Sequence, residues 1–254
     1  KTLWTEAGEG ERLRFYCAQN EDDEAQYVAA RIMEHKGAGG SFRDNAVLYR
    51  MNAQSNRLEF AFKRNGIPYK VYGGMRFFDR AEIKDMLAYL CCIASPADDL
   101  RLTRIINTPQ RGIGDRTVEE IRAIAQREGV PMSEIISRAN QYEELQRAAA
   151  KIIKFSDLMS ELRALSLTAG VDELYDAVVE KTGYVRALQE KKNDENTARI
   201  ENVGELKTNI LGYMKETGDA SLSGFLDEVA LYTDLDNYNE DADCAVMMTM
   251  HSAT

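Results

Sequence analysis

The spacing of hydrophobic and polar positions changes near residue 74. Before that point, short apolar runs alternate with amphipathic stretches of helical period. The expected strands are 12–19, 45–51 and 69–72, and the expected helices are 22–36 and 54–65. Strands separated by helices of about a dozen residues are typical of a parallel α/β sheet.

After residue 80 the apolar positions recur at three- and four-residue spacing, which is typical of amphipathic helices. The expected helices are 81–94, 100–107, 117–128, 132–142, 144–165, 171–189, 197–216 and 222–232. Residues 244–251 return to strand character. This order predicts a helical block inserted into an α/β domain. Because the chain begins without Met and ends abruptly, we expect it to be a piece of a longer protein.

One turn in the helical block has a composition that suits a phosphate. Residues 108–117 read TPQRGIGDRT, and a Gly-x-Gly turn lets backbone N–H groups approach an anion closely. Arg111 and Arg116 flank the turn and can neutralise the same phosphate. Thr117 and Glu120 have capping-box spacing, so a helix is expected to open just after the glycines. By itself the turn is equally consistent with an ordinary corner between two helices.

Two further candidate sites follow predicted strands. Arg50, Asn52 and Ser55 come after strand 45–51, and ligands of parallel sheets lie beyond the carboxyl ends of strands. Thr249 and His251 lie two residues apart on the last strand, which predicts that they share a face. By themselves these residues are better explained as a helix-capping loop and a half-exposed strand end.

Composition and charge narrow the classes of function. No apolar run approaches the roughly 20 residues of a membrane span, and the N-terminus lacks signal-peptide character, so no membrane partner is expected. Four cysteines and two histidines fit no metal-binding spacing, so no metal site is expected. The net charge of −10 argues against general coating of nucleic acid. Residues 101–116 nevertheless carry four Arg and one Asp, a local net charge of +3.

Five segments stand in a distinctive order along the chain. They are VLYRMNAQS at 47–55, YGGMRFFDRAEIKD at 72–85, INTPQRGIGDRT at 106–117, RIENVGEL at 199–206 and AVMMTMHSA at 245–253. In this order and at this spacing they resemble the UvrD/PcrA/Rep family of superfamily 1 DNA helicases. The resemblance runs over essentially all 254 residues.

The resemblance implies a partial RecA-like parallel α/β domain interrupted by a large helical insert that contains a helix-hairpin-helix-like turn. Residues 1–74 would be the first part of the second RecA-like domain, 75–240 the insert, and 241–254 the return strand. Gly73 and Gly74 would form a hinge on which the insert swivels. Phe77, Phe78 and Arg80 follow these glycines; exposed aromatic side chains there could stack on bases, but packing of the insert on its parent domain explains them better.

The resemblance also implies a function: the parent would be an ATP-dependent 3′–5′ DNA helicase of DNA repair or replication, acting in the bacterial cytoplasm at the nucleoid. ATP and Mg²⁺ would serve the parent. This chain has neither a phosphate-loop nor a magnesium motif, so we expect it to bind no cofactor and to hydrolyse no ATP by itself.

DNA is the partner that the resemblance implies, as single strand and as duplex junction. The implied duplex contacts, made to phosphates without reading sequence, are Thr108, Arg111, Gly112, Ile113, Gly114, Arg116 and Thr117. The implied single-strand contacts are Arg50, Asn52, Ser55, Thr249 and His251. Protein partners on the insert are a further expectation. Two alternatives remain open: a non-enzymatic DNA-binding or protein-docking module, and the helicase part of a recombination nuclease.

Overall fold

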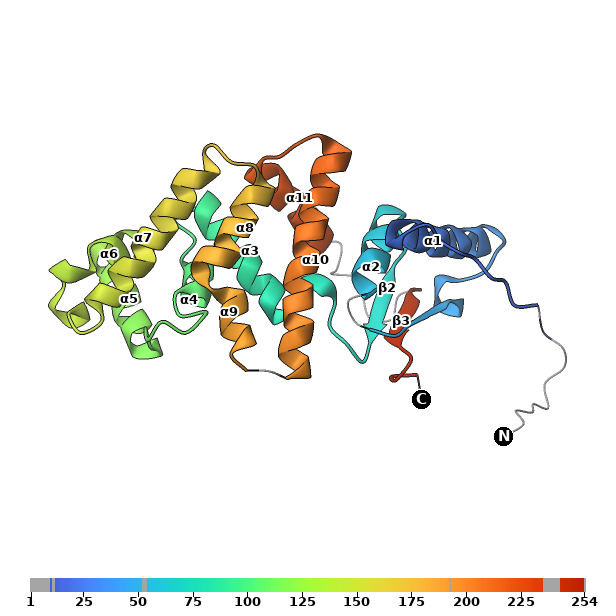
Figure 1. The fold of residues 1–254 in the computed structure, drawn as a ribbon, viewed down its shortest axis with the longest axis horizontal. Coiled ribbons are helices and arrows are strands. Elements are labelled where there is room, and N and C mark those ends of the chain that lie inside the picture. Colours follow the sequence, from blue (N-terminus) through green and yellow to red (C-terminus); the bar gives the residue numbers. More distant parts are fainter. Residues whose placement is uncertain (1–9, 11, 52–53, 192, 235–242, 254) are drawn as a thin grey trace.

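The computed structural model describes the chain except for residues 1–9, 11, 52–53, 192, 235–242 and 254. The molecule is elongated, with a small sheet and two helices at one end and a larger group of helices at the other (Figure 1). We call these the α/β part and the helical part. Buried hydrophobic side chains form a separate cluster in each part.

The α/β part is built on a parallel sheet of three strands in the order β1-β3-β2. The strands are β1 (Ala46–Tyr49), β2 (Tyr69–Tyr72) and β3 (Ala245–Thr249). The two helices are α1 (Glu21–Gly37) and α2 (Ser55–Arg64). The middle strand, β3, comes from the far end of the chain. In the sequence, the whole helical part is therefore inserted between the paired strands β2 and β3. This order confirms the expectation of a partial α/β domain interrupted by a helical block.

One face of this sheet is buried and the other is open in the described part of the chain. Tyr49, Ala245 and Met247 are buried in the same cluster as residues of α1 and α2. On the opposite face Leu48 and Tyr72 are exposed by 50% and 59%. The pairing register sets both beside Met248, so they lie in one row across the sheet.

The strand expected at residues 12–19 is wrong. Residues 12–18 have no regular structure, and Leu13 and Phe15 are almost fully exposed. Alternation of apolar and polar residues becomes a strand only where a neighbouring strand can accept its backbone hydrogen bonds. In the described sheet β3 pairs with β1 and β2 and not with this segment.

The helical part consists of helices packed around a buried central helix. The helices are α3 (Ala81–Ala94), α4 (Asp99–Ile105), α5 (Asp115–Glu128), α6 (Met132–Ser137), α7 (Ala149–Ser166), α8 (Val171–Thr182), α9 (Tyr184–Gln189), α10 (Asp194–Thr217) and α11 (Leu222–Asp234). Short 3₁₀ turns, η1 (Phe42–Asp44), η3 (Phe77–Asp79), η4 (Ala139–Gln141) and η5 (Glu143–Leu145), join some of the elements. Central α3 contacts α4, α7, α8, α10 and α11.

Several helix boundaries differ from the expected ones for local reasons. The helix expected at 171–189 divides into α8 and α9 because Gly183 adopts a left-handed conformation, φ +70°. Helix α10 begins three residues early because the Asn193 side chain accepts the Asn196 N–H and caps it. Helix α6 ends at Ser137, and the apolar spacing after it continues through 3₁₀ turns up to α7.

A cluster of buried polar side chains joins the two parts. We call it the junction cluster and define it as Ser55, Glu59, Arg80, Glu82 and Asn202, all less than 9% exposed. The Arg80 guanidinium donates to Ser55 Oγ at 2.8 Å and to Asn202 Oδ1 at 2.7 Å. Asn202 in turn donates to Glu82. Helices α2, α3 and α10 are thereby tied through one buried arginine.

Glu59 is the buried carboxylate of this cluster. Ser55 Oγ donates to it at 2.8 Å, and Tyr69 Oη and the Phe77 N–H each donate at 3.1 Å. Burial raises the pKa of Glu59 above its ordinary value of 4.5, although the hydrogen bonds and the Arg80 charge oppose the change.

Further contacts cross the same junction. Asn56 and Asn209 exchange amide hydrogen bonds of 3.1 and 3.2 Å between α2 and α10. Phe77, Phe78 and Arg80 are buried, which confirms that they pack at the join. Gly73 has φ +70°, and a Cβ there would lie 2.7 Å from Ser252 Oγ, so this turn requires glycine. Any swivel about Gly73 and Gly74 must break these hydrogen bonds.

We predict that Arg80→Ala lowers the free energy of unfolding by about 3 kcal/mol, because it leaves buried acceptors without their donor. Urea unfolding followed by circular dichroism measures the change. The matched control is Arg127→Ala, which removes an exposed ion pair with Glu144 and should cost less than about 1 kcal/mol. Equal losses in the two variants would contradict the structural role of Arg80.

Glu59→Gln should change how stability depends on pH. The folded-state pKa of Glu59 is raised, so its contribution to stability is greatest at low pH and is lost as pH rises through that pKa. The glutamine does not titrate. The stability of the variant relative to the parent chain should therefore increase as pH rises from the ordinary pKa of a glutamate through the raised pKa of Glu59, as measured by urea titrations at several pH values. A constant difference across this range would show that burial does not control this carboxylate.

Candidate nucleic-acid interface

The turn between α4 and α5 is tightly organised, and we refer to residues 107–114 as the hairpin. The Asn107 side chain organises it, because its Oδ1 accepts the backbone N–H groups of Arg111 at 2.8 Å and Ile113 at 3.2 Å. Ile113 is fully buried and anchors the hairpin in the core of the helical part. Gly112 has φ +72°, a conformation that favours glycine.

Arg111 points into the helical part. Its guanidinium donates to the carbonyl oxygens of Ile105 and Pro109 at 3.1 and 3.0 Å, and to Tyr89 Oη at 2.6 Å. It also lies 5.2 Å from the ring centre of Phe155. Four partners inside the fold make Arg111 a positioning residue for the hairpin.

Tyr89 completes this support from α3. Its hydroxyl donates to the Thr108 carbonyl oxygen and accepts from Arg111. Burial raises the pKa of Tyr89 to about 12, so the hydroxyl keeps its proton and stays a donor. The hairpin is therefore held on the helical part by buried polar contacts as well as by Ile113.

The helix that follows the hairpin opens toward solvent. Helix α5 begins at Asp115 with Gly114 as its N-cap, and the first intrahelical bond runs from the Val118 N–H to the Gly114 carbonyl. The expected capping by Thr117 is wrong, because Thr117 already lies in the first turn and Glu120 pairs with Arg116. No side chain in the described part of the chain caps this end, so its N–H groups remain available.

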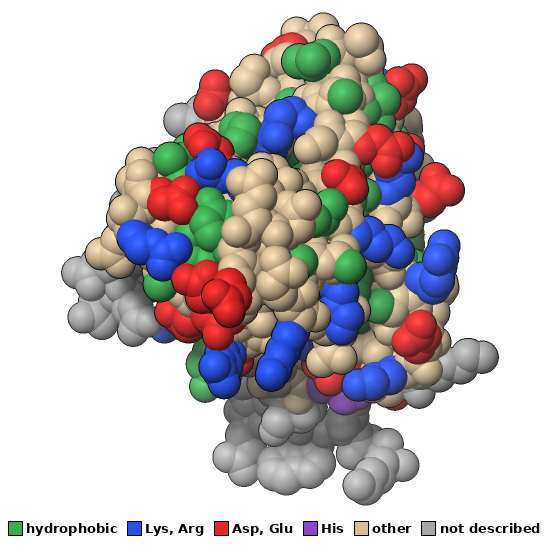
Figure 2. Space-filling view, turned by 90° about the vertical axis from the view of Figure 1, so that its left-hand side faces the viewer, with side chains coloured by type: hydrophobic (Ala, Val, Ile, Leu, Met, Phe, Trp, Pro, Cys, Tyr) green, Lys and Arg blue, Asp and Glu red, His purple; other side chains and the backbone are tan. Residues whose placement is uncertain are grey.

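Two cationic side chains flank the open helix end. Arg116 is 93% exposed, and its Nε lies 3.0 Å from Glu120 Oε1 in a surface ion pair. Lys151, exposed on α7, brings its Nζ to 3.4 Å from the Gly112 carbonyl oxygen. Sequence reasoning missed Lys151, because nothing in its local spacing relates it to a turn 39 residues earlier. Figure 2 shows this end of the helical part, with Lys and Arg side chains frequent along its lower edge.

A second group of candidate residues meets at the carboxyl edge of the sheet. Arg50 is exposed directly after β1, and its backbone N–H is held by Gln54 Oε1 at 3.0 Å. Thr249 ends β3 beside Tyr49, and the Met250 N–H donates to the Tyr49 carbonyl oxygen. Parallel pairing thus brings together Arg50 and Thr249, which are far apart in the sequence.

Two of the other residues expected at this edge, Ser55 and His251, are not found in the expected positions. Ser55 is fully buried in the junction cluster, so its hydroxyl is not presented at the surface. His251 is exposed in the turn after β3; its expected place on the strand, sharing a face with Thr249, is wrong because pairing ends at Thr249. Asn52 lies outside the described residues.

Exposed apolar side chains surround the same edge and were missed by sequence reasoning. They lie at or just after the ends of the three strands and are between 54% and 61% exposed: Met51, Tyr72, Met75 and Met250. Their signal in the sequence is weak, because single apolar residues in loops are common on protein surfaces. Their gathering at one edge is visible only after the strands pair.

Within the described residues, no group of three potential metal ligands occurs, and no helix is both long and apolar enough to cross a bilayer. The sequence contains no phosphate-loop motif that would cradle a nucleotide. The exposed cationic and backbone donors described above are suited instead to phosphates of an extended ligand.

Comparison with known proteins agrees with this geometry. The chain is 36% identical over 255 aligned residues to proteins named ATP-dependent DNA helicase PcrA from Staphylococcus epidermidis and from Staphylococcus aureus. The alignments cover 100% of this chain and 35% of those proteins, so the chain spans about a third of their length. A family model described as the UvrD-like helicase C-terminal domain matches residues 1–254. The chain therefore belongs to the UvrD-like helicase C-terminal domain family.

Proposed function

We propose that this chain forms the second RecA-like domain, in part, and the helical insert of an ATP-dependent 3′–5′ DNA helicase. The observation that carries the proposal is the hairpin at 107–114, whose open helix end stands between the exposed cations Arg116 and Lys151. Family membership and the names of the relatives support the same reading.

In this proposal the hairpin grips the backbone of duplex DNA. A phosphate approaches the glycines, where Gly114 has no atom within 4 Å of a Cβ position, and accepts N–H groups from the start of α5. Arg116 exchanges its solvent-exposed pairing with Glu120 for the phosphate, because a surface ion pair contributes little free energy. All these donors contact phosphates, so the grip is independent of base sequence.

The carboxyl edge of the sheet would carry single-stranded DNA. Arg50, Thr249 and His251 supply polar contacts to the strand, and the exposed Tyr72 supplies an aromatic face for a base. Ser55 supports this edge indirectly, through Arg80 and Glu59, and does not contact the strand itself.

We propose the boundaries 1–74, 75–240 and 241–254 for the two RecA-like segments and the insert between them. The separate hydrophobic clusters of the α/β and helical parts support such a division. ATP and Mg²⁺ would be bound by the whole helicase, with the phosphate loop supplied from outside these 254 residues. The whole protein would act in DNA repair or replication in the bacterial cytoplasm.

Replacing both Arg116 and Lys151 with Ala should weaken binding to a blunt DNA duplex on the order of tenfold and reduce the salt dependence of binding. Each cation releases counterions when it neutralises a phosphate. Fluorescence anisotropy with duplexes of two unrelated sequences measures both effects, which should be equal for the two. Arg127→Ala, at the other end of α5, is the matched control and should bind like the parent chain.

The two hairpin glycines should respond differently to alanine. Gly114→Ala has space and φ −80°, so the fold should be retained while the added methyl obstructs a phosphate and weakens duplex binding. Gly112→Ala requires φ +72° and a Cβ 2.5 Å from Lys151 Nζ, so thermal stability should fall. Unchanged duplex binding by Gly114→Ala would refute the phosphate grip.

A further inference from the structure

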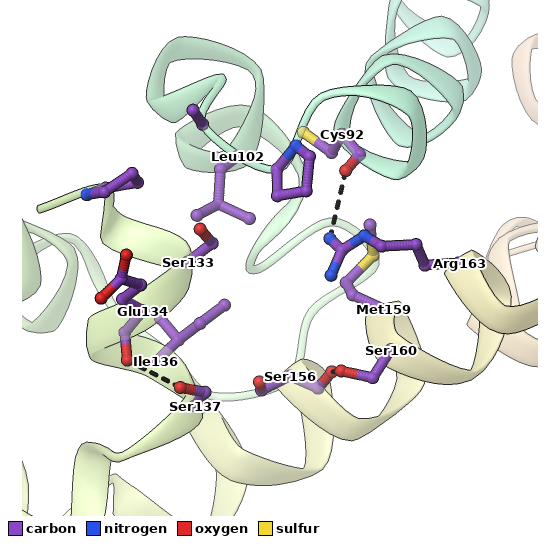
Figure 3. A pocket seen from close by; sticks show the side chains of 13 residues that line it. Cys92, Leu102, Ser133, Glu134, Ile136, Ser137, Ser156, Met159, Ser160 and Arg163 are labelled. Carbon is purple, nitrogen blue, oxygen red and sulfur yellow. Dashed lines mark hydrogen bonds between the residues drawn. The ribbon is translucent and has the colours of Figure 1, made fainter.

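A cavity of about 390 Å³ lies between α6, α7 and the loop that joins α3 to α4. This volume is within the roughly 300–1,000 Å³ range of ligand sites in proteins. Its lining is mixed (Figure 3): Leu102, Ile136 and Met159 are apolar, and serines stand on both helical walls. The proposed DNA contacts use none of these residues.

Arg163 reaches into this cavity from α7 (Figure 3). Its Nη2 donates to the Cys92 carbonyl oxygen at 3.3 Å. That carbonyl belongs to the last turn of α3, where residue 96 is proline and offers no N–H to it. One guanidinium donor is thus committed to the end of α3, which fixes the direction of the side chain.

The positive charge of Arg163 has no acidic partner among the described residues. Its Nε is buried without a hydrogen-bond acceptor, and its Nη2 donates to a neutral carbonyl. A partly buried guanidinium is stabilised by a carboxylate in bidentate geometry. The α7 wall of the cavity thus carries an unpaired cation and is suited to an anionic group of a ligand, whereas the Glu134 carboxylate belongs to the α6 wall.

The rest of the lining distinguishes a peptide from a nucleic acid. Ser133 and Ser156 stand on opposite walls and offer hydroxyls to the N–H and C=O groups of an extended backbone (Figure 3). The apolar side chains provide a place for an aliphatic side chain. Glu134 also lines the cavity. Its carboxylate would repel a polyanion such as a nucleic acid more strongly than a peptide with a single carboxylate placed beside Arg163.

The Arg163 side of the cavity lies away from the hairpin along α7, although Ser156 of the cavity is only five residues after Lys151. Arg163 and Lys151 are twelve residues apart on α7, a separation of about 18 Å along the helix axis. Pro131 and Ser133 of the cavity follow the C-terminal end of α5, whose N-terminal end carries the hairpin. A ligand in the cavity can therefore be held while DNA is bound at the hairpin.

We propose that this cavity is a docking site for a short acidic peptide segment of a partner protein. The Arg163 guanidinium receives an Asp or Glu carboxylate, the serines hydrogen-bond the peptide backbone, and an aliphatic neighbour of the acidic residue contacts Met159. The site is separate from the proposed DNA contacts and does not depend on them.

The test uses the 254-residue chain labelled with ¹³C at its methionine methyl groups, with Met159 as the reporter. The probes are acetylated, amidated tripeptides with a central Asp or Glu between Ala, Val or Leu residues, each paired with its Asn or Gln counterpart. We expect at least one acidic peptide to shift the Met159 signal saturably, with affinity about tenfold above that of its amide counterpart.

Variants assign the effect to the cavity. Arg163→Gln should abolish the preference for acid over amide, and Arg163→Lys should retain part of it. Ser160→Phe narrows the cavity while Arg163 and Cys92 are both retained, and it should abolish binding even if Arg163→Gln fails to fold. Arg116→Ala should leave peptide binding unchanged, whereas Arg163→Gln should leave duplex binding unchanged, so the two sites fail independently.

Three results would overturn the proposal. The first is the absence of a saturable Met159 shift with every acidic peptide. The second is equal binding of acidic and amide peptides. The third is displacement of the peptide by inorganic phosphate or by a single-stranded oligonucleotide at lower concentration than the peptide itself, which would make the cavity a phosphate site.

Discussion

Burial of a charged group between the α/β part and the helical part is the constraint on which this structure depends. Arg80 is 6% exposed and Glu59 3% exposed, and removing such groups from water is costly unless their hydrogen bonds are satisfied. Ser55, Asn202 and the Phe77 backbone satisfy them. These bonds have fixed directions, so they determine the orientation of the helical part more narrowly than apolar contact would.

This constraint bears on how the helical part can move. A glycine pair at 73–74 provides backbone freedom, yet the junction cluster and the Asn56–Asn209 pair hold the two parts in one arrangement. A second arrangement would have to replace these hydrogen bonds with others or with water. The junction cluster is thus the natural place for motion of the helical part to be controlled.

The same residue type has opposite roles at the candidate sites. Arg111 is bonded to three carbonyl or hydroxyl groups inside the fold and shapes the hairpin, whereas Arg116 is almost fully exposed at its edge. Arg163 lies between these extremes, with one donor committed to α3 and its charge facing a cavity. The three arginines differ in how many hydrogen-bond acceptors surround each guanidinium.

The sequence by itself determined the class of fold, the positions of most helices, the three paired strands and the glycine-containing turn before α5. Those features depend on local periodicity and on turn chemistry, which are determined by residues close together in the sequence. Tertiary structure decided that residues 12–18 form no strand, that Ser55 is buried and that Lys151 stands beside Gly112. It also turned Arg111 inward, although Arg111 and Arg116 look alike in the sequence. Strand pairing, burial and charge compensation depend on residues distant in the chain, and no local pattern records which of them will meet.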